Sequence, residues 1–182
     1  EVQTGFGRTG KLFAHEWTSV TPDVMACAKG IAGGFPCGAV LATDPVASSM
    51  TAGSHGSTFG GNPLAMAVAN ANLDVLTADS FLDDVVRSGE ALQAGLRGVA
   101  DRHPDIICDI RGKGLMVGMV VAAPFTNSQL GDAARDVDLL TVVAGENVLR
   151  MLPPLIIGEE EIVQAVDAIE QACQALASSS DA

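Results

Sequence analysis

The chain has 182 residues, of which 48% are hydrophobic and 18% are charged, so its composition predicts a packed core and argues against bulk disorder. Ten basic and 22 acidic residues give a net charge of −12, which argues against a nucleic-acid backbone or an anionic membrane surface as the main partner. Glycine or charge interrupts every apolar stretch before it reaches the length of a membrane span. The four cysteines form no CxxC pair and the three histidines show no metal-ligand spacing. We therefore expect free thiols in a reducing compartment such as the cytoplasm, and no bound metal.

The first 62 residues predict a glycine-rich loop region with short apolar runs at VMACA and GAVLA. Asn62 is a good N-cap and Pro63 a good first-turn residue, so a helix is predicted over 63–78. Ser80 is expected to cap a second helix over 81–103, which Pro104 ends. One apolar face of this helix is marked by Phe81, Val85, Leu92, Leu96 and Val99.

Strands and helices alternate in the remainder of the chain. Strands are predicted over 106–110 and 115–122, joined through RGKG, followed by a helix over 127–140 and short strands over 141–145 and 147–152. The last helix, over 159–177, begins with three glutamates, which interact favourably with the helix dipole. Its apolar positions follow a 4-3-4-3 spacing at Ile162, Val166, Ile169, Cys173 and Leu176. This order of elements predicts an α/β or α+β fold.

The segment GFGRTGK, from Gly5 to Lys11, matches two phosphate-binding patterns only in part. A P-loop needs Ser or Thr after its lysine to hold Mg²⁺, and Leu12 stands there. A dinucleotide loop must open a helix, but the sequence soon runs into Trp17, several β-branched residues and Pro22. We therefore do not predict a nucleotide site here.

Lys29 lies in VMACAKGIAGGFPCGAV, after an apolar run and before a glycine-rich turn. An amine that apolar neighbours desolvate is a usable nucleophile toward a carbonyl carbon. The alternative is a lysine at a strand end whose stem covers apolar surface while its amine stays in water. The following Gly30, Gly33, Gly34 and Pro36 favour a ligand site, because glycines let the backbone approach a ligand closely.

Arg150 stands between apolar residues in VLRMLPPL, on a predicted strand. A guanidinium there is costly unless it is paired, and its planar fork suits a carboxylate held by two hydrogen bonds. The alternative is a structural salt bridge with an acid of the 159–161 run. We favour the anion-binding role.

Four blocks of the sequence resemble, in the same order, successive signatures of the class III aminotransferases. The blocks are EVQTGFGRTGKLFAHE, TPDVMACAKGIAGGFPCGA, GSHGSTFGGNPLA and LRMLPPLII, and they are spread over most of the chain. The resemblance implies a fold-type-I enzyme that depends on pyridoxal 5′-phosphate (PLP). It further implies that the chain is the C-terminal part of a subunit. Residues 1–80 would then be the end of the PLP-binding large domain, and residues 81–182 the small α/β C-terminal domain.

The resemblance also implies roles for single residues. Lys29 matches the lysine that forms the Schiff base with PLP, and Gln3 matches a side chain that hydrogen-bonds the phenolic oxygen of the cofactor. Val2 matches an apolar residue packed on the ring. Glu1 directly follows the position of the carboxylate that pairs with the ring nitrogen, and the resemblance places it among the cofactor-binding residues as well. Thr58 matches a hydroxyl that reaches the PLP phosphate of the neighbouring subunit. In the substrate site, the matches are Ser57 at a contact position and Arg150 at the α-carboxylate; Ser57 and Thr58 also fit ordinary turn residues.

The amino-acid sequences of the second and third blocks most resemble those of one branch of the family. Enzymes of this branch move an amino group between N-acetylornithine and 2-oxoglutarate in arginine biosynthesis. The resemblance therefore implies a small-molecule amino donor, a 2-oxo acid and a homodimer with shared sites as partners, with no nucleic acid or membrane. Ornithine or another class III ω-aminotransferase activity is the first alternative. An inactive fragment, or a piece that serves as a binding module, is the second.

Overall fold

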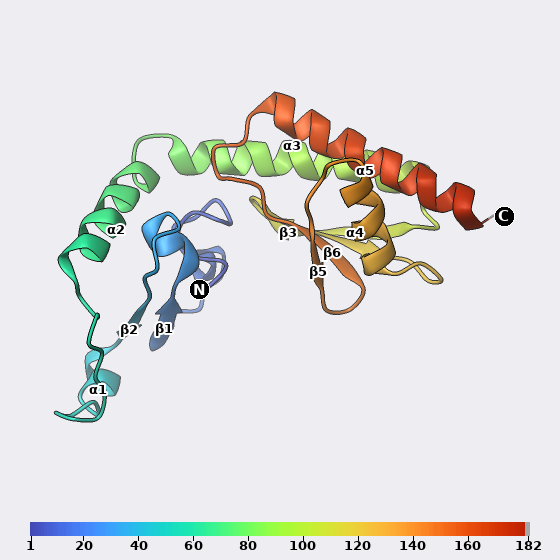
Figure 1. Cartoon of the computed structure of the whole chain (residues 1–182). Coiled ribbons are helices and arrows are strands. Elements are labelled where there is room, and N and C mark those ends of the chain that lie inside the picture. The colour runs from blue at the N-terminus through green and yellow to red at the C-terminus, as the bar shows by residue number, and fades with distance from the viewer. Residues whose placement is uncertain (181–182) are drawn as a thin grey trace. The chain divides into compact units, whose positions relative to one another are not determined.

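The computed structural model describes residues 1–180 and divides into two compact units, Glu1–Asp83 and Asp84–Ala182 (Figure 1). Each unit has its own antiparallel sheet. Strands and helices are mixed along the chain, so the predicted combination of the two is confirmed. Within residues 1–180, no helix is both long and apolar enough to cross a membrane.

Unit 1 contains a two-stranded sheet and one long helix. Strand β1 (Val24–Cys27) pairs with β2 (Ala39–Ala42) in a register that sets Cys27 opposite Ala39. The two apolar runs that were expected within a loop region thus pair with each other, because pairing satisfies their backbone groups. The other short elements of unit 1 are η1 (Ala14–Trp17), η2 (Lys29–Ala32) and α1 (Asp44–Ala47).

Helix α2 (Pro63–Leu76) begins at the predicted residue. The side-chain oxygen of Asn62 accepts a hydrogen bond from the backbone N–H of Ala65 at 2.9 Å, and Pro63 occupies the first turn. The helix packs on η2, and this contact joins residues more than 30 positions apart in sequence.

Many apolar side chains of unit 1 are exposed. On the paired strands, Val24 is 51% exposed, Val40 68% and Leu41 48%. A sheet of two strands buries too little surface to cover them. Other exposed apolar residues of this unit include Val20, Val46, Met50, Phe59 and Leu64. Unit 1 therefore presents a large apolar surface.

Unit 2 is a four-stranded antiparallel sheet with helices on one face. The strands lie in the order β3 (Ile107–Lys113), β4 (Met116–Val121), β6 (Val148–Met151), β5 (Val142–Ala144). The helices are α3 (Phe81–Arg102), α4 (Asn127–Asp136) and α5 (Glu159–Ser180). Along β4, Val117 and Met119 are fully buried, and they alternate with residues of the opposite face.

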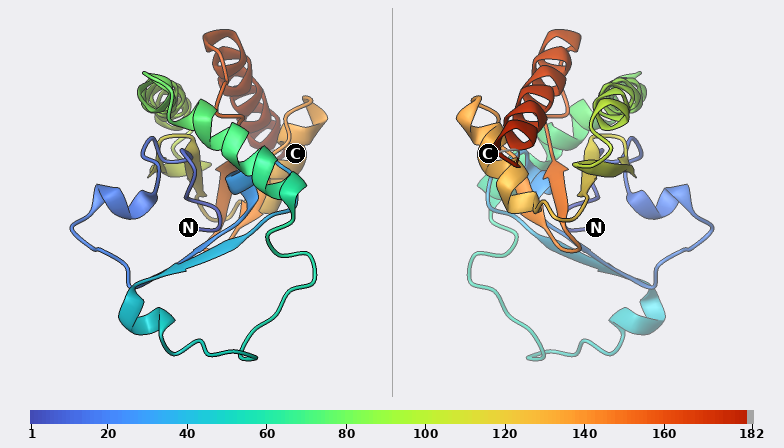
Figure 2. Two further views of the ribbon diagram at one scale, coloured as in Figure 1. Left: turned by 90° about the vertical axis from the view of Figure 1, so that its left-hand side faces the viewer. Right: turned by 90° about the vertical axis from the view of Figure 1, so that its right-hand side faces the viewer.

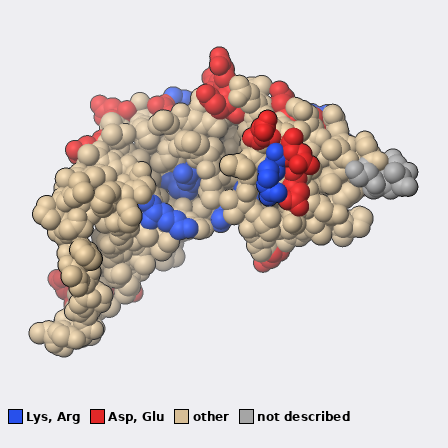
Figure 3. Space-filling model, viewed as in Figure 1, with Lys and Arg blue, Asp and Glu red and all other residues tan. Residues whose placement is uncertain are grey.

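The helices of unit 2 bury the apolar faces that their periodicity predicts. Leu92 and Leu96 of α3 are fully buried, as are Ile169 and Cys173 of α5. Burial raises the pKa of the Cys173 thiol to about 12, so this thiol stays protonated and behaves as a small apolar group. Figure 3 shows acidic side chains gathered at the start of α5, where three glutamates form the first turn.

The expected cap of α3 is wrong. The helix begins at Phe81, but Ser80 has a φ of +66°, which is the left-handed region and not the extended backbone of an N-cap. The backbone N–H of Phe81 bonds the carbonyl of Ala78 at 3.2 Å, so a tight turn between α2 and α3 sets the backbone of Ser80.

Helix α3 lies directly on the turn between β3 and β4. A Cβ at Gly89 would lie 2.3 Å from the carbonyl oxygen of Gly114, so only glycine permits this approach. Gly114 itself has a φ of +52°, a conformation that favours glycine. The backbones of the helix and of the turn are therefore in direct contact.

We expect Gly89→Ala to lower the free energy of unfolding by about 2 kcal/mol or more, because the added methyl group would overlap backbone atoms that cannot move aside. Gly98→Ala is the matched control on the same helix. Its nearest atom is the mobile end of Arg102 at 3.5 Å, so it should stabilise by about 0.5–1 kcal/mol. Urea unfolding followed by circular dichroism measures both changes, and equal effects would contradict the contact.

A charged cluster joins the end of α3 to α5. Glu170 accepts a hydrogen bond from Nε of Arg102 at 2.9 Å, and its other oxygen lies 2.8 Å from Nε2 of His103 and 3.0 Å from the amide of Gln174. The Arg102 guanidinium, with His103 and Gln174, outweighs the effect of burial and lowers the pKa of Glu170 to about 2. The carboxylate is therefore bound in its ionised form.

A carboxylate with a lowered pKa stabilises the fold above its ordinary pKa of 4.5, and loses that contribution as pH falls toward about 2. We expect Glu170→Gln to cost about 1 kcal/mol at neutral pH, and this difference from the unsubstituted protein should shrink between pH 4.5 and 2. Asp167→Asn, at an exposed position on the same helix, is the control and should change little. Urea unfolding across this pH range measures the difference, and a constant difference would contradict the assignment.

Candidate active site

Lys29 begins the short helix η2 in an unusual backbone conformation. Strand β1 ends at Cys27, Ala28 is extended, and Lys29 then has a φ of +50°. The left-handed region costs a non-glycine residue roughly 1–2 kcal/mol. Gly33 ends η2, also in a left-handed conformation, with a φ of 57°. Such an outlier at a candidate nucleophile indicates a backbone that surrounding structure holds in place.

The side chain of Lys29 is exposed, so the described residues do not desolvate it as the flanking apolar run predicts. The apolar residues of β1 alternate along the strand, and only Cys27 is fully buried. Burial raises the pKa of the Cys27 thiol, and the nearby carboxylate of Glu1 acts in the same direction. A protonated buried thiol is a poor nucleophile, so Cys27 is not a candidate nucleophile of this turn.

The N-terminal loop is closed by its own hydrogen bonds. The carboxylate of Glu1 accepts a hydrogen bond from the backbone N–H of His15 at 3.0 Å and another from the hydroxyl of Thr4. Burial alone would raise the pKa of this carboxyl, but these bonds and one from Ala14 hold it below its ordinary value. Trp17 donates from its ring N–H to the carbonyl of Thr9 at 3.1 Å. The loop is followed by the four-residue η1 and not by an α-helix, which agrees with the argument against a nucleotide site.

This loop packs beside the turn of Lys29. A Cβ at Gly30 would lie 3.4 Å from the Cβ of Phe6, so the two segments are in van der Waals contact. Unit 1 therefore holds Val2, Gln3 and Lys29 in one compact body, and Val2 is 41% exposed. An accessible amine, an exposed apolar side chain and an amide suit a flat aldehyde cofactor such as PLP.

Ser57 and Thr58 lie in the segment between α1 and α2, and both are exposed. Figure 2 shows this segment as an extended loop that runs outward before it returns to α2. Phe59 next to them is 81% exposed. The hydroxyls of Ser57 and Thr58 are therefore accessible at the surface of unit 1.

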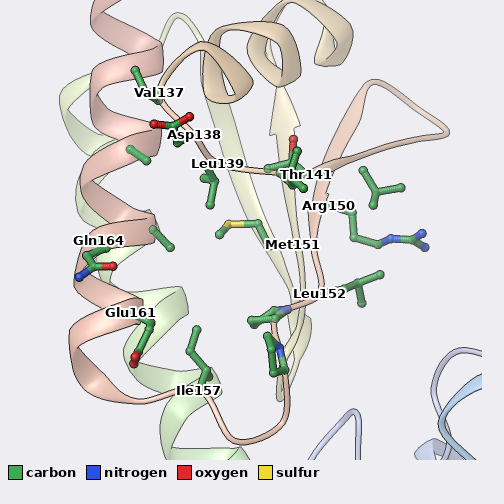
Figure 4. A pocket seen from close by; sticks show the side chains of 16 residues that line it. Val137, Asp138, Leu139, Thr141, Arg150, Met151, Leu152, Ile157, Glu161 and Gln164 are labelled. Carbon is green, nitrogen blue, oxygen red and sulfur yellow. The ribbon is translucent and has the colours of Figure 1, made fainter. Parts of the chain in front are cut away.

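Arg150 lies on β6, on the face of the sheet opposite the helices. Its neighbours Leu149 and Met151 are buried, at 0% and 5% exposure, and face the helices. Figure 4 shows the guanidinium pointing away from Met151 and from Glu161 of α5. This direction disfavours the alternative of a structural salt bridge with the 159–161 run.

Arg150 stands opposite Gly118 of β4, and Gly118 stands opposite Arg111 of β3. The two arginines therefore share one face of the sheet. The side chain of Val148 covers the glycine between them, because a Cβ at Gly118 would lie 2.8 Å from Cγ1 of Val148. Arg111 also bonds the carboxylate of Glu146 at 2.9 Å. The sequence motif RGKG gave no reason to place Arg111 near Arg150, because strand pairing and not sequence spacing sets the distance between them.

A half-open cavity of about 510 Å³ lies on the helix side of this sheet, beside β5 (Figure 4). Its walls are mostly apolar, and Asp138, Glu161 and Gln164 add polar groups. Arg150 is a lining residue, but its guanidinium points out of the cavity. Over the described part of the chain, no group of three metal-ligating side chains is present.

The family model for aminotransferase class-III matches residues 1–173. The chain belongs to the class III aminotransferases. The expected C-terminal part of a fold-type-I enzyme is confirmed by solved aminotransferase structures, which match nearly all of this chain.

Relatives from several organisms show how much of a subunit the chain represents. The acetylornithine aminotransferase of Mesorhizobium japonicum is 57% identical over 177 residues, which are 97% of this chain and 44% of that protein. The structure of acetylornithine aminotransferase from Elizabethkingia anophelis matches with a TM-score of 0.85 at 36% identity, over 96% of this chain and 44% of that one. An ornithine aminotransferase from Toxoplasma gondii matches with a TM-score of 0.90 at 33% identity, over 100% and 44%. The chain thus spans less than half the length of these proteins.

Proposed function

We propose that the chain is the C-terminal part of an aminotransferase subunit that moves an amino group between N-acetylornithine and 2-oxoglutarate in arginine biosynthesis. The observation that carries this proposal is Lys29, an accessible amine on a left-handed turn in the segment that resembles the family's lysine motif. The names of the relatives at 44–57% identity support the substrate. Residues 1–80 would end the large domain, and residues 81–182 would form the small one.

The cofactor of this proposal is PLP, and the ornithine aminotransferase of Toxoplasma gondii has PLP at partial occupancy in its active site. Bound PLP supplies an aldehyde carbon that accepts the amino group and a ring that withdraws electrons from the substrate. Lys29 would bond that carbon, while Gln3 would donate to the phenolic oxygen and Val2 would cover the ring. Glu1, whose carboxylate ties the loop to His15, would hold Val2 and Gln3 in place.

The chain's own groups have distinct tasks in this proposal. The amine of Lys29, once displaced by the substrate, would hold and move the proton at the substrate Cα. Arg150 would bind the α-carboxylate through its planar fork, on a strand whose buried neighbours fix its position. Ser57 would contact the substrate beside Thr58.

We also place the active enzyme in a homodimer. Thr58 would donate to the PLP phosphate of the partner subunit, which fits its exposed loop and the exposed Phe59 beside it. A dimer with shared sites needs an interface at this loop, and apolar side chains already lie there. The four cysteines are free thiols, which fits a cytoplasmic enzyme. The net charge of −12 fits small-molecule partners and neither nucleic acid nor membrane.

Ornithine is the second candidate amino donor. The Toxoplasma gondii ornithine aminotransferase matches with a TM-score of 0.90, against 0.85 for the Elizabethkingia anophelis acetylornithine aminotransferase. Turnover of the two amines by the full-length enzyme, compared as kcat/KM, decides between them. A protein that turns over neither, and binds no PLP, would instead be a binding module.

The full-length enzyme should carry PLP covalently on Lys29 after borohydride reduction. Mass spectrometry of the digested protein should place the pyridoxyl group there and on neither Lys11 nor Lys113, the other two lysines of this chain. Lys29→Ala should lower turnover by several orders of magnitude, as loss of a covalent nucleophile does. Lys11→Ala, whose amine lies over the Trp17 ring, is the control and should stay active. A pyridoxyl group on another lysine would contradict the proposal.

Arg150→Ala should lower kcat/KM about 100-fold for the amino donor and for the 2-oxo acid alike, because both carry an α-carboxylate. Arg150→Lys should recover only part of the loss, since an ammonium cannot form the two parallel bonds. Arg135→Ala is the matched control, because Arg135 is an exposed arginine of the same unit that pairs with Asp132 at 2.8 Å. Steady-state kinetics measures all three, and an unchanged KM and kcat in Arg150→Ala would remove the carboxylate role.

A further inference from the structure

Asn72 of α2 reaches across to the turn that Lys29 begins. Its side-chain amide donates hydrogen bonds to the carbonyl oxygens of Gly30, at 2.9 Å, and Ile31, at 3.4 Å. These carbonyls belong to the two residues that follow Lys29. The contact spans 42 residues of sequence, so no local pattern predicts it.

The two hydrogen bonds from Asn72 support a turn that has few backbone hydrogen bonds of its own. The backbone N–H of Gly33 bonds the carbonyl of Gly30 at 3.3 Å, and Ile31 bonds Ala28 at 3.1 Å. Gly30 thus accepts one bond from the turn and one from Asn72. A helix of four residues has too few internal bonds to hold itself, and α2 supplies the missing support.

The side chain of Asn72 also lies against Gly33, at the end of the turn that Lys29 begins. A Cβ at Gly33 would lie 3.1 Å from the side-chain oxygen of Asn72, so the amide fills the space beside this glycine. Asn72 therefore lies against η2 and against the residue that caps it. Its side-chain nitrogen bonds the carbonyls of Gly30 and Ile31, and its side-chain oxygen lies beside Gly33.

We propose that Asn72 is a positioning residue that holds Lys29 in its left-handed conformation, and so aims its amine at the cofactor aldehyde. The inference rests on the proposed function of Lys29. Asn72 itself touches neither cofactor nor substrate in this assignment. A left-handed lysine relaxes toward ordinary backbone when its turn is released, and the direction of its Cα–Cβ bond changes with it.

The test uses the full-length enzyme freed of cofactor. PLP is added, and borohydride trapping at timed intervals gives the rate of covalent bonding at Lys29. We expect Asn72→Ala and Asn72→Asp to slow this rate about ten- to hundredfold, as misplacement of a reacting group does. Binding of pyridoxine 5′-phosphate, which has no aldehyde, should stay within about twofold, since no covalent bond to lysine enters it.

Two comparisons separate positioning from packing. Asn72→Asp keeps the size of the side chain and an oxygen beside Gly33 but loses the donor, so a packing role predicts a normal trapping rate for this variant. Asn70→Ala, an exposed asparagine of the same helix, is the control and should trap PLP at the original rate. In Asn72→Asp, kcat should fall while the KM for the 2-oxo acid is unchanged.

The outcomes are distinguishable. If the unsubstituted enzyme traps PLP on Lys29 and Asn72→Asp does so equally fast, the inference fails while the proposed function stands. A parallel loss of pyridoxine 5′-phosphate binding and trapping would show general damage to the site and would also overturn it. If the unsubstituted enzyme forms no adduct on Lys29, both ideas fall.

Discussion

The left-handed backbone of Lys29 is the constraint on which the arrangement of unit 1 depends. This conformation costs a lysine roughly 1–2 kcal/mol, so contacts with other segments are needed to stabilise it. Phe6 of the N-terminal loop packs on one side of the turn, and Asn72 of α2 bonds it on another. A hydrogen bond from the backbone N–H of His15 to the carboxylate of Glu1 closes this loop. Segments that are far apart in sequence thus converge on one residue.

In unit 2, the alternation of a β-strand sets the position of the charged residue Arg150. The sheet sets Leu149 and Met151 in the core, and the alternation of a strand then turns Arg150 to the other face. Burial of these two neighbours therefore fixes the position of Arg150 on the outer face of the strand. A core that tolerates little movement makes a rigid base for an anion-binding side chain.

The sequence predicts those helix starts and helix faces that depend only on neighbouring residues in the chain. The start of α2 follows from Asn62 and Pro63, and the faces of α3 and α5 follow from their periodicity. The pairing of β1 with β2 and the backbone of Ser80 were missed, because both depend on partners or turns outside the local pattern. At the site, Lys29 and Arg150 stand out as charges in apolar runs. Asn72 lies on an ordinary helix face, and its role depends on a contact that only the folded chain makes.

The contact of Gly89 with Gly114 has a consequence for how this fold can change over time. Most close contacts involve a side chain, so a larger residue on one side can be offset by a smaller residue on the other. Here both partners are backbone, and neither has an atom that a second substitution could remove. No second substitution can therefore make room for a larger residue at position 89. Descendants of this sequence must keep Gly89 or shift α3 away from the β3–β4 turn.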